Sequence, residues 1–224
     1  MNILTPSFTI LTPISPGGIE ELKHLERIGR VCYKSEDKIS EDGSSAKKFI
    51  ANIIKSGHEA IIEHGSVSVL FTVDRGVTHE IVRHRVASYA QESTRYVNYS
   101  LDKFGNGINV IDVTSCVDYD SSLSNLSAEE LQQVYYEWYD AMADAERHYM
   151  KMLELGVSPQ IARSVLPNST KAELTMTANY REWRHFFQLR CAKGAHPQMR
   201  EIAILLCKEF QEQLPILFDD IKVD

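Results

Sequence analysis

The sequence predicts a single mixed α/β domain, and three observations support that prediction. Apolar and polar residues alternate with period two at residues 66–73, which is typical of a strand with one buried face. Apolar residues recur at helical spacing before this strand, at 19–31 and 45–56, and after it, at 127–155. The 224 residues, 43% of them hydrophobic, contain no internal repeat and no low-complexity linker, so one domain spanning residues 1–224 could bury a full core.

The N-terminal part is expected to form a short strand and then two helices. An apolar start is broken by Pro-Gly-Gly, after which Ile19 to Val31 shows the spacing of an amphipathic helix. A polar stretch follows, and Ser45 is expected to cap a second helix that runs to about Ser56. Gly57 stands at the end of that helix, where a left-handed residue is common.

The clearest strand candidate begins at Ser66, and one of its faces is uniformly apolar: Val67, Val69, Phe71 and Val73. Residues 74–76, Asp-Arg-Gly, are expected to end the strand. Val77 to Arg85 then fits a helix capped by Thr78. A basic segment that starts at Arg83 would therefore begin on a helix and continue into a loop.

The second half of the chain is expected to be mainly helical. A short strand candidate at 108–113 precedes Ser127-Ala-Glu-Glu, a capping-box sequence that opens a long helix to about Leu155, with Gly156 beyond its end. A second long helical pattern fills residues 169–192, and a last helix is expected from about 196 to 213.

Composition argues against two classes of partner. With 24 Lys and Arg against 31 Asp and Glu, the formal net charge is −7, so a general attraction to nucleic acid or to an anionic membrane is not expected. No stretch approaches the roughly 18 apolar residues that span a bilayer. The start lacks the basic and apolar regions of a signal peptide, and we expect a cytoplasmic protein.

The cysteines and histidines do not form a recognisable metal or disulfide pattern. The four cysteines include no Cys-x-x-Cys pair, which argues against a zinc knuckle and a disulfide framework. The closest imitation of a zinc-protease motif has His58 and His64 six residues apart, so the two would not share a helix face. The sequence therefore predicts no metal site.

Residues 83–96 carry the strongest local signal. They read Arg-His-Arg-Val-Ala-Ser-Tyr-Ala-Gln-Glu-Ser-Thr-Arg-Tyr, with three arginines, one histidine and two serines in an otherwise acidic chain. Arginine presents five donors in a rigid fork that fits phosphate, and hydroxyls with backbone N–H groups in a turn can complete a cradle. Glu92 is the only acidic residue in this segment, so the segment has a net positive charge and predicts an anion site.

A second basic cluster lies in the downstream half. It comprises Asn179-Tyr180-Arg181, His185 and Arg190, with Arg163 sixteen residues before Asn179. Arg181 and His185 are i, i+4 neighbours on a helix, so they are expected to face one ligand together. The alternative for any one of these residues is a place on a solvated helix face.

The two clusters together resemble a known family. Arg83-His84-Arg85 is followed by Ser88, Ser93 and Arg95 at the fifth, tenth and twelfth positions after Arg83, as in the flavin-dependent thymidylate synthases. Further matching motifs occur in the same order along the chain, and the resemblance spans roughly residues 20–205: Gly57-His58-Glu59, Glu63-His64, Ala162-Arg163, Leu166-Pro167, Asn179-x-Arg181 and Leu189-Arg190.

The resemblance implies an α+β domain with a central, mostly antiparallel sheet flanked by long helices. It also implies a homotetramer with FAD between subunits. The implied reaction is reductive methylation of dUMP to dTMP, with NADPH reducing the flavin and methylenetetrahydrofolate supplying the carbon. No enzyme cysteine adds to the uracil ring in this family.

The resemblance also implies roles for individual residues. Arg190 corresponds to a catalytic arginine that polarises the uracil, a role that suits a permanent guanidinium charge. Flavin contacts are expected from Arg83, His84, Arg85, Gln91, Asn179, Tyr180, Arg181, His185 and His58. Nucleotide contacts are expected from Glu80, Arg83, Gln91, Glu92, Ser93, Thr94, Arg95, Arg163 and Arg190.

The chain departs from the family at a few of these positions. Glu80 stands where some members have glutamine, and its carboxylate would accept a hydrogen bond from a ribose hydroxyl. His185 stands where some have asparagine. His196 lies about two residues later than the corresponding histidine of some relatives.

Two other functions are considered. The segment 83–96 could serve a non-enzymatic nucleic-acid module, against which the net acidity argues. A hydrolase of nucleoside phosphates is the other alternative, but the chain lacks a P-loop and a carboxylate cluster suited to magnesium. Cys191 adjoins Arg190 and could be a nucleophile, although an inert buried thiol is the preferred interpretation.

Overall fold

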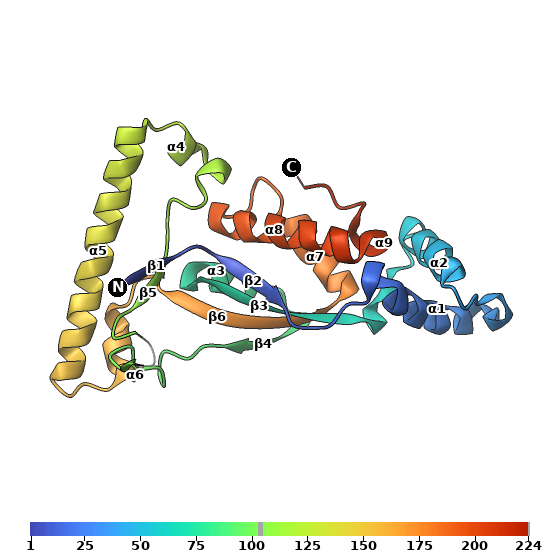
Figure 1. Ribbon diagram of the computed structural model, residues 1–224, viewed down its shortest axis with the longest axis horizontal. Coiled ribbons are helices and arrows are strands. Elements are labelled where there is room, and N and C mark those ends of the chain that lie inside the picture. Colours follow the sequence, from blue (N-terminus) through green and yellow to red (C-terminus); the bar gives the residue numbers. More distant parts are fainter. Residues whose placement is uncertain (103–104, 224) are drawn as a thin grey trace. The chain divides into compact units, whose positions relative to one another are not determined.

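A computed structural model describes residues 1–102 and 105–223 of the chain (Figure 1). The chain forms two compact units. Unit 1 comprises Met1–Phe8, Leu70–Arg83 and Tyr89–Thr175, and unit 2 comprises Thr9–Val69, His84–Ser88 and Met176–Asp224. The expectation of a single domain remains a prediction.

A four-stranded sheet has the order β2-β3-β6-β4. Its strands are β2 (Ser7–Ile10), β3 (Ser66–Asp74), β6 (Lys171–Asn179) and β4 (Ala87–Gln91), and each has residues in both units. The hydroxyls of Ser68 and Thr177 are 2.8 Å apart at one end of the β3–β6 pair, while Arg75 N–H donates to the Thr170 carbonyl at 3.1 Å near the other. The pair is therefore antiparallel, and the α+β class with an antiparallel sheet is confirmed.

The helix predicted over 169–192 is wrong in its first half, which is strand β6. Along β6 the buried positions alternate, so the strand obeys period two: Ala172, Leu174, Met176 and Ala178. The helix begins only at Tyr180, as α7 (Tyr180–Arg190), with Asn179 as its N-cap. Because the apolar residues of the strand run directly into those of the helix, one continuous pattern hides the boundary.

The helix predicted over 77–85 is also displaced. Helix α3 spans Arg75–Ile81, and its cap is Asp74, whose Oδ1 accepts from Val77 N–H at 2.6 Å. Thr78, the predicted cap, is buried inside the helix and donates its hydroxyl to the Arg75 carbonyl. The basic segment starting at Arg83 is therefore a turn followed by strand β4, rather than the end of a helix.

Unit 1 contains the long helix α5 (Ala128–Glu154), which begins at the predicted capping box of Ser127 and Glu130. Gly156, at φ 84°, follows its end, as expected. This unit also contains α3, α4 (Ser121–Ser124), α6 (Pro159–Ala162) and the parallel pair β1 (Asn2–Leu4) and β5 (Asn109–Ile111), the last within the predicted strand 108–113. A cluster of buried side chains forms the core of this unit: Tyr99, Ile108, Val110, Met142, Tyr149 and Ala162.

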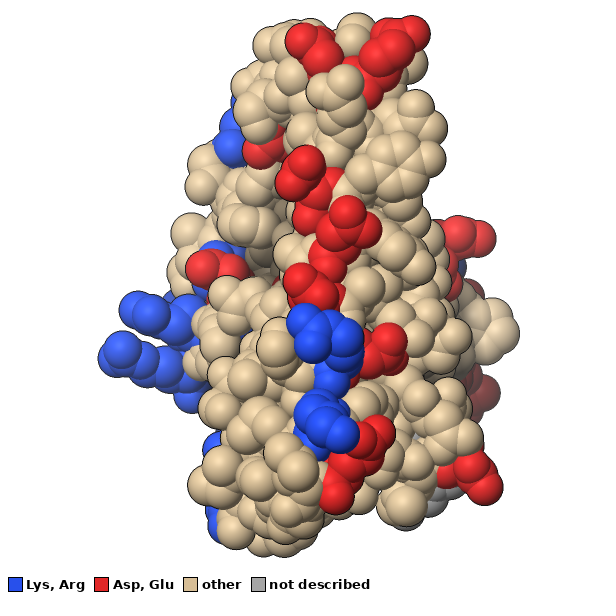
Figure 2. Space-filling model, turned by 90° about the vertical axis from the view of Figure 1, so that its left-hand side faces the viewer, with Lys and Arg blue, Asp and Glu red and all other residues tan. Residues whose placement is uncertain are grey.

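Most of the charged side chains on the exposed face of α5 are acidic (Figure 2). Its basic residues Arg147 and Lys151 form ion pairs with Asp144 and Glu154 at 3.2 and 2.9 Å. Such exposed i, i+3 pairs contribute little to stability. This face carries no excess of positive charge that would attract a polyanion.

Unit 2 contains α1 (Ile19–Tyr33), α2 (Ser44–Lys55), α7, α8 (Pro197–Gln213) and α9 (Pro215–Phe218). Helices α7 and α8 pack together (Figure 1) around edge-to-face and stacked rings that are fully buried: Trp183, Phe186, Phe187, Phe210 and Phe218. This aromatic core holds α7, the helix that carries most of the downstream site candidates.

The N-cap predicted for α2 is wrong. The cap position is Gly43, at φ 77°, and Ser45 lies inside the first turn. The Ser45 hydroxyl instead donates to Glu26 at 2.8 Å and accepts from Ser40 N–H at 2.8 Å. Ser45 therefore ties α2 to the buried carboxylate of α1.

Over the residues that the structure describes, none of the helices combines the length and apolar character required to cross a membrane. Cys116, Cys191 and Cys207 carry buried thiols, and Cys32 carries an exposed one.

Candidate functional site

The predicted site residues fall into two groups, one in each unit. The nucleotide candidates Glu80, Arg83, 91–95 and Arg163 belong to unit 1. The flavin candidates other than Arg83 and Gln91 belong to unit 2, with the catalytic candidate Arg190: His58, His84, Arg85, Asn179, Tyr180, Arg181 and His185.

In unit 1, a tight turn follows strand β4. The N–H groups of Tyr96 and Val97 both donate to the Ser93 carbonyl, at 3.1 and 3.0 Å. Thr94 is 4% exposed, and its hydroxyl accepts from Arg163 Nη1 at 3.2 Å. The fold thus brings Arg163 to the turn across 69 residues of sequence.

Arg95 completes this arrangement on the exposed side of the turn. Its N–H donates to the Ser93 hydroxyl at 3.4 Å, and its guanidinium lies 5.5 Å from the centre of the Tyr96 ring. Tyr96 is 80% exposed, so it supports Arg95 by a cation–π contact rather than filling the core. Two guanidinium groups and the hydroxyls of the turn together suit a phosphate.

Glu92 and Gln91 make contacts within the unit. The Glu92 carboxylate accepts from Lys171 Nζ and the Tyr99 hydroxyl, both at 3.0 Å, and from the N–H of Glu173 at 3.2 Å. Gln91 donates to the Thr78 hydroxyl at 3.0 Å. These contacts fix the end of β4, and the predicted ligand roles of Glu92 and Gln91 remain predictions.

The contacts of Glu92 shift the pKa values of two neighbouring groups, Tyr99 and Lys171. Burial, with the Glu92 charge beside it, raises the pKa of Tyr99 far above its ordinary value. Burial alone would lower the pKa of Lys171, but hydrogen bonds and ion pairs with Glu173 and Glu92 raise it overall. Tyr99 is therefore a neutral donor and Lys171 a fixed cation at physiological pH.

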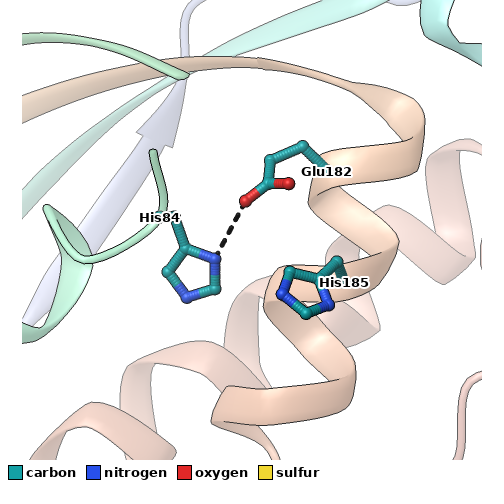
Figure 3. Close-up of side chains that lie close together, drawn as sticks. All are labelled: His84, Glu182 and His185. Atoms are coloured by element: carbon teal, nitrogen blue, oxygen red, sulfur yellow. Dashed lines mark hydrogen bonds and ion pairs between the residues drawn. The ribbon is translucent and has the colours of Figure 1, made fainter. Parts of the chain in front are cut away.

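In unit 2, His84 contacts residues from both ends of helix α7, and Figure 3 shows its contact with Glu182 in the first turn. Its Nδ1 lies 3.1 Å from Glu182 Oε1, and Arg190 Nε donates to its Nε2 at 3.0 Å. The imidazole is 4% exposed and packs against the Phe186 ring at 4.9 Å. Arg190, the predicted catalytic residue, is thus joined to the Arg-His-Arg motif across 106 residues of sequence.

The environment favours neutral His84. Burial lowers the pKa of His84, and the nearby charges of Arg190 and His185 lower it further, while Glu182 opposes the shift. Glu182 is itself held in the first turn of α7, where its N–H donates to the Asn179 side chain at 2.8 Å. A carboxylate at this end of a helix is stabilised by the helix dipole, and Arg190 in the last turn is favoured for the same reason.

A pocket of about 400 Å³ opens beside this network. It is lined by Glu59, Glu63, Val86, Asn179, Arg181, Glu182, Arg184, His185 and Gln188. Arg181 and His185 therefore line one pocket, as their spacing predicts. Arg181 also pairs with Glu63 at 2.6 Å and with Glu59 at 3.6 Å, so a ligand there would meet carboxylates as well as donors.

His84, Glu182 and His185 also form a group that could hold a metal ion, because their ligand atoms lie within 4.8 Å of one another. However, both nitrogens of His84 are already engaged, one with Glu182 and one with Arg190. A metal would have to displace one of these contacts. The three residues are better suited to a hydrogen-bond network than to an ion.

The predicted residues Tyr180 and His58 lie apart from this network, and so does His196. Tyr180 is 3% exposed and packs against Phe218 in the core, so its side chain offers no ligand contact in this geometry. His58 is exposed and lines a different pocket of about 410 Å³, which Arg30 also lines. His196 is exposed at the N-cap of α8.

Cys191 follows Arg190 directly and is 2% exposed. A hydrogen bond with Cys207 lowers the pKa of the Cys191 thiol, against the opposite effect of burial. The burial of Cys191 agrees with its interpretation as a core thiol.

The prediction missed Glu182, the carboxylate on which the His84 contact depends. Its spacing from Asn179, three residues after an N-cap, is the capping-box spacing and could have drawn attention to it. Glu59 and Glu63, which pair with Arg181, were noticed only as parts of motifs.

Comparisons with known proteins agree on one family. Residues 20–216 match the family model described as thymidylate synthase complementing protein. The chain is 33% identical over 220 residues to the flavin-dependent thymidylate synthase of Corynebacterium aurimucosum, covering 94% of this chain and 84% of that protein. It is 34% identical over 208 residues to the protein of that name from Mycobacterium sp. (strain JLS), covering 89% and 79%.

A solved structure shares the fold. It is the crystal structure of a UMP/dUMP methylase PolB from Streptomyces cacaoi bound with 5-Br dUMP, with a TM-score of 0.79 and 23% sequence identity. The match covers 98% of this chain and 96% of that chain.

Proposed function

Because the chain belongs to the flavin-dependent thymidylate synthase family, we propose that it catalyses the reductive methylation of dUMP to dTMP. The cofactor is FAD, and NADPH and methylenetetrahydrofolate are the co-substrates. The observation that carries this proposal is the hydrogen bond from Arg190 to His84, because it joins the two motifs by which the chain resembles the family.

The pocket beside His84 fits part of a flavin. Its volume of about 400 Å³ lies within the usual range for small-molecule sites. Arg181, His185 and Gln188 offer donors to ring heteroatoms or a pyrophosphate, and Val86 offers an apolar contact. FAD would supply hydride to the nucleotide once NADPH has reduced it.

Different residues of the chain then have different roles in binding and catalysis. Arg163, Arg95 and the turn at Ser93 hold the nucleotide phosphate. Arg190 places a permanent positive charge against the uracil and stabilises the negative charge that develops on it. The remaining candidates, including Glu80 toward the ribose, orient the two ligands.

The assembly belongs to the proposal as well. A homotetramer with FAD between subunits would complete each site with residues from more than one chain, in the cytoplasm. Light scattering of the purified protein should give the mass of four chains. A stable monomer with full activity would refute this part.

A direct assay tests the reaction. Purified protein should be yellow, should bleach with NADPH, and should form dTMP from dUMP and methylenetetrahydrofolate. UMP is the control substrate, because the structural neighbour PolB is called a UMP/dUMP methylase. Absence of flavin and of product from either nucleotide would reject the proposal, and preference for UMP would redirect it to ribonucleotides.

A cysteine variant tests the absence of a thiol nucleophile. Cys191→Ala should keep activity within about three-fold, because nucleophile removal typically costs far more than this. Cys207→Ala is a matched control for loss of the neighbouring buried thiol. If Cys191→Ala alone lost all activity with an intact fold and flavin, a thiol mechanism would replace the one proposed here.

A further inference from the structure

Glu182 has no part in the function proposed above, yet it is the third member of the chain of contacts that ends at Arg190. Its side chain is only 11% exposed, and His84, to which it is bonded, is buried beside it. Figure 3 shows the carboxylate pointing at the imidazole from the first turn of α7. A carboxylate withdrawn from water this far requires a partner, and His84 is that partner.

The positions of the protons follow from the contacts. An arginine Nε always carries a hydrogen and can only donate, so Nε2 of His84 must be the acceptor in its contact with Arg190. In neutral imidazole the proton then lies on Nδ1, which donates to Glu182 Oε1. The other neutral tautomer would place two N–H groups face to face at Arg190 and two acceptors face to face at Glu182.

The geometry of α7 explains why one histidine can form hydrogen bonds with residues from both ends of the helix. Long side chains on a helix lean toward its N-terminus, so Arg190 in the last turn reaches back toward the turn that carries Glu182. His84 comes from the segment before β4 and bonds to both. Holding Nε fixes the plane of the guanidinium and removes much of the rotamer freedom of the side chain.

We propose that Glu182 is a positioning residue for Arg190, acting by holding His84 in the tautomer that accepts from Arg190 Nε. The inference rests on the proposed function only in the role of Arg190 toward the uracil. Glu182 also lines the pocket assigned to FAD, but in this proposal it acts on Arg190 through its hydrogen bond to His84. By keeping the Arg190 guanidinium in a fixed orientation, Glu182 stabilises the transition state more than the bound substrate.

Kinetics give the first test. Glu182→Leu removes the acceptor at similar size and should lower kcat by about 100-fold, the cost of a misplaced catalytic group. KM for dUMP and flavin absorbance should stay close to wild type. Glu182→Gln keeps an acceptor oxygen and should recover about ten-fold of that loss. Glu20→Leu removes an exposed first-turn carboxylate from α1 of the same unit and is the matched control, with unchanged kcat.

A direct observation of the histidine gives the second test, which does not need turnover. In protein labelled with ¹⁵N at histidine, and assigned with a His84→Gln variant, His84 should show the Nδ1–H tautomer. Glu182→Leu, or Glu182→Gln if the leucine variant does not fold, should shift it toward Nε2–H. The Glu20→Leu control should leave it unchanged.

The outcomes separate the two proposals. Wild-type His84 in the Nε2–H form, or a tautomer unaffected by substitution of Glu182, would overturn the positioning role even if dTMP is formed. Equal kcat losses in Glu182→Leu and Glu182→Gln would also overturn it. Failure of the wild-type protein to form dTMP would reject the proposed function, while the tautomer measurement would still decide the hydrogen-bond network.

Discussion

The turn of unit 1 and the histidine network of unit 2 both hold arginines, but they hold them differently. In the turn, Arg163 makes a 3.2 Å contact to a hydroxyl, and Arg95 lies over an exposed ring. In the network, Arg190 donates to a buried imidazole that is bonded in turn to a carboxylate. The two arginines at the turn are exposed and lie against the turn, whereas Arg190 is anchored by buried side chains.

This difference matches two kinds of task. Because a phosphate binds mainly through its negative charge, long arginine side chains on a turn can close around it. Polarising a ring at one atom requires a donor whose direction is set before the ligand arrives. Under the proposed function, we therefore expect affinity for the nucleotide to depend mainly on the turn and the reaction rate to depend mainly on the histidine network.

Replacing Arg190 should have the largest effect. Arg190→Ala should reduce dTMP formation by about 1,000-fold, the upper cost of losing an electrostatic donor. FAD should remain largely bound, because Arg190 is not one of the flavin candidates and these are all intact. Loss of product formation with normal flavin absorbance would agree with a catalytic role for Arg190. Normal turnover would exclude that role.

Replacing Arg163 should affect binding more than rate. Arg163→Ala removes a charged donor to the phosphate and should raise the dissociation constant for dUMP by about 10- to 100-fold, as expected for about 1.5–3 kcal/mol. The value of kcat at saturating dUMP should change little. Calorimetric titration measures the affinity, with Arg147→Ala on the exposed face of α5 as the control. A large loss of kcat with unchanged affinity would break the division between the units.

Much of the fold is predictable from the sequence because its signals are local. The strand from Ser66 and the helix beginning at Ser127 follow from alternation and a capping box, and both are confirmed. Strand β6 was missed because nine alternating residues run without a break into α7. The start of α3 was missed because a strand-ending Asp74 doubles as its cap.

The site is less predictable than the fold. Residue types and spacing point to Arg163 and Arg190, but their contacts with Thr94 and His84 join positions 69 and 106 residues apart. Each of these pairs depends on tertiary packing within its own unit, which no local pattern encodes. Glu182 was missed for the same reason, since a first-turn glutamate is common in helices that bind nothing.

Glu92 offers a smaller test of what belongs to the nucleotide turn. Glu92→Gln weakens a largely buried set of contacts, so the free energy of unfolding should fall by about 1–2 kcal/mol. Lys171 keeps its 3.0 Å pair with Glu173, which limits the loss. Urea denaturation measures it, and Glu173→Gln, at an exposed side chain, is the control. A rise in the dissociation constant for dUMP as large as that expected for Arg163→Ala would instead make Glu92 a nucleotide contact, as the family resemblance implies.

The pH dependence of stability is the smallest effect and concerns unit 2. The pKa of His84 is lowered in the folded protein by burial, with Arg190 and His185 adding to the shift and Glu182 opposing it. Folding therefore favours the neutral imidazole, and its contribution to stability is complete above the unfolded pKa of about 6.5. As pH falls below that value the unfolded state gains a proton first, so stability decreases until the folded pKa is reached.

A variant without the imidazole isolates this contribution, because the other seven histidines are common to both proteins. Between pH 7.5 and 5.5, the wild-type free energy of unfolding should fall more steeply than that of His84→Gln. Denaturation curves at several pH values measure the difference. If the variant had the steeper dependence, His84 would be charged in the folded state, and its Nε2 could not accept from Arg190.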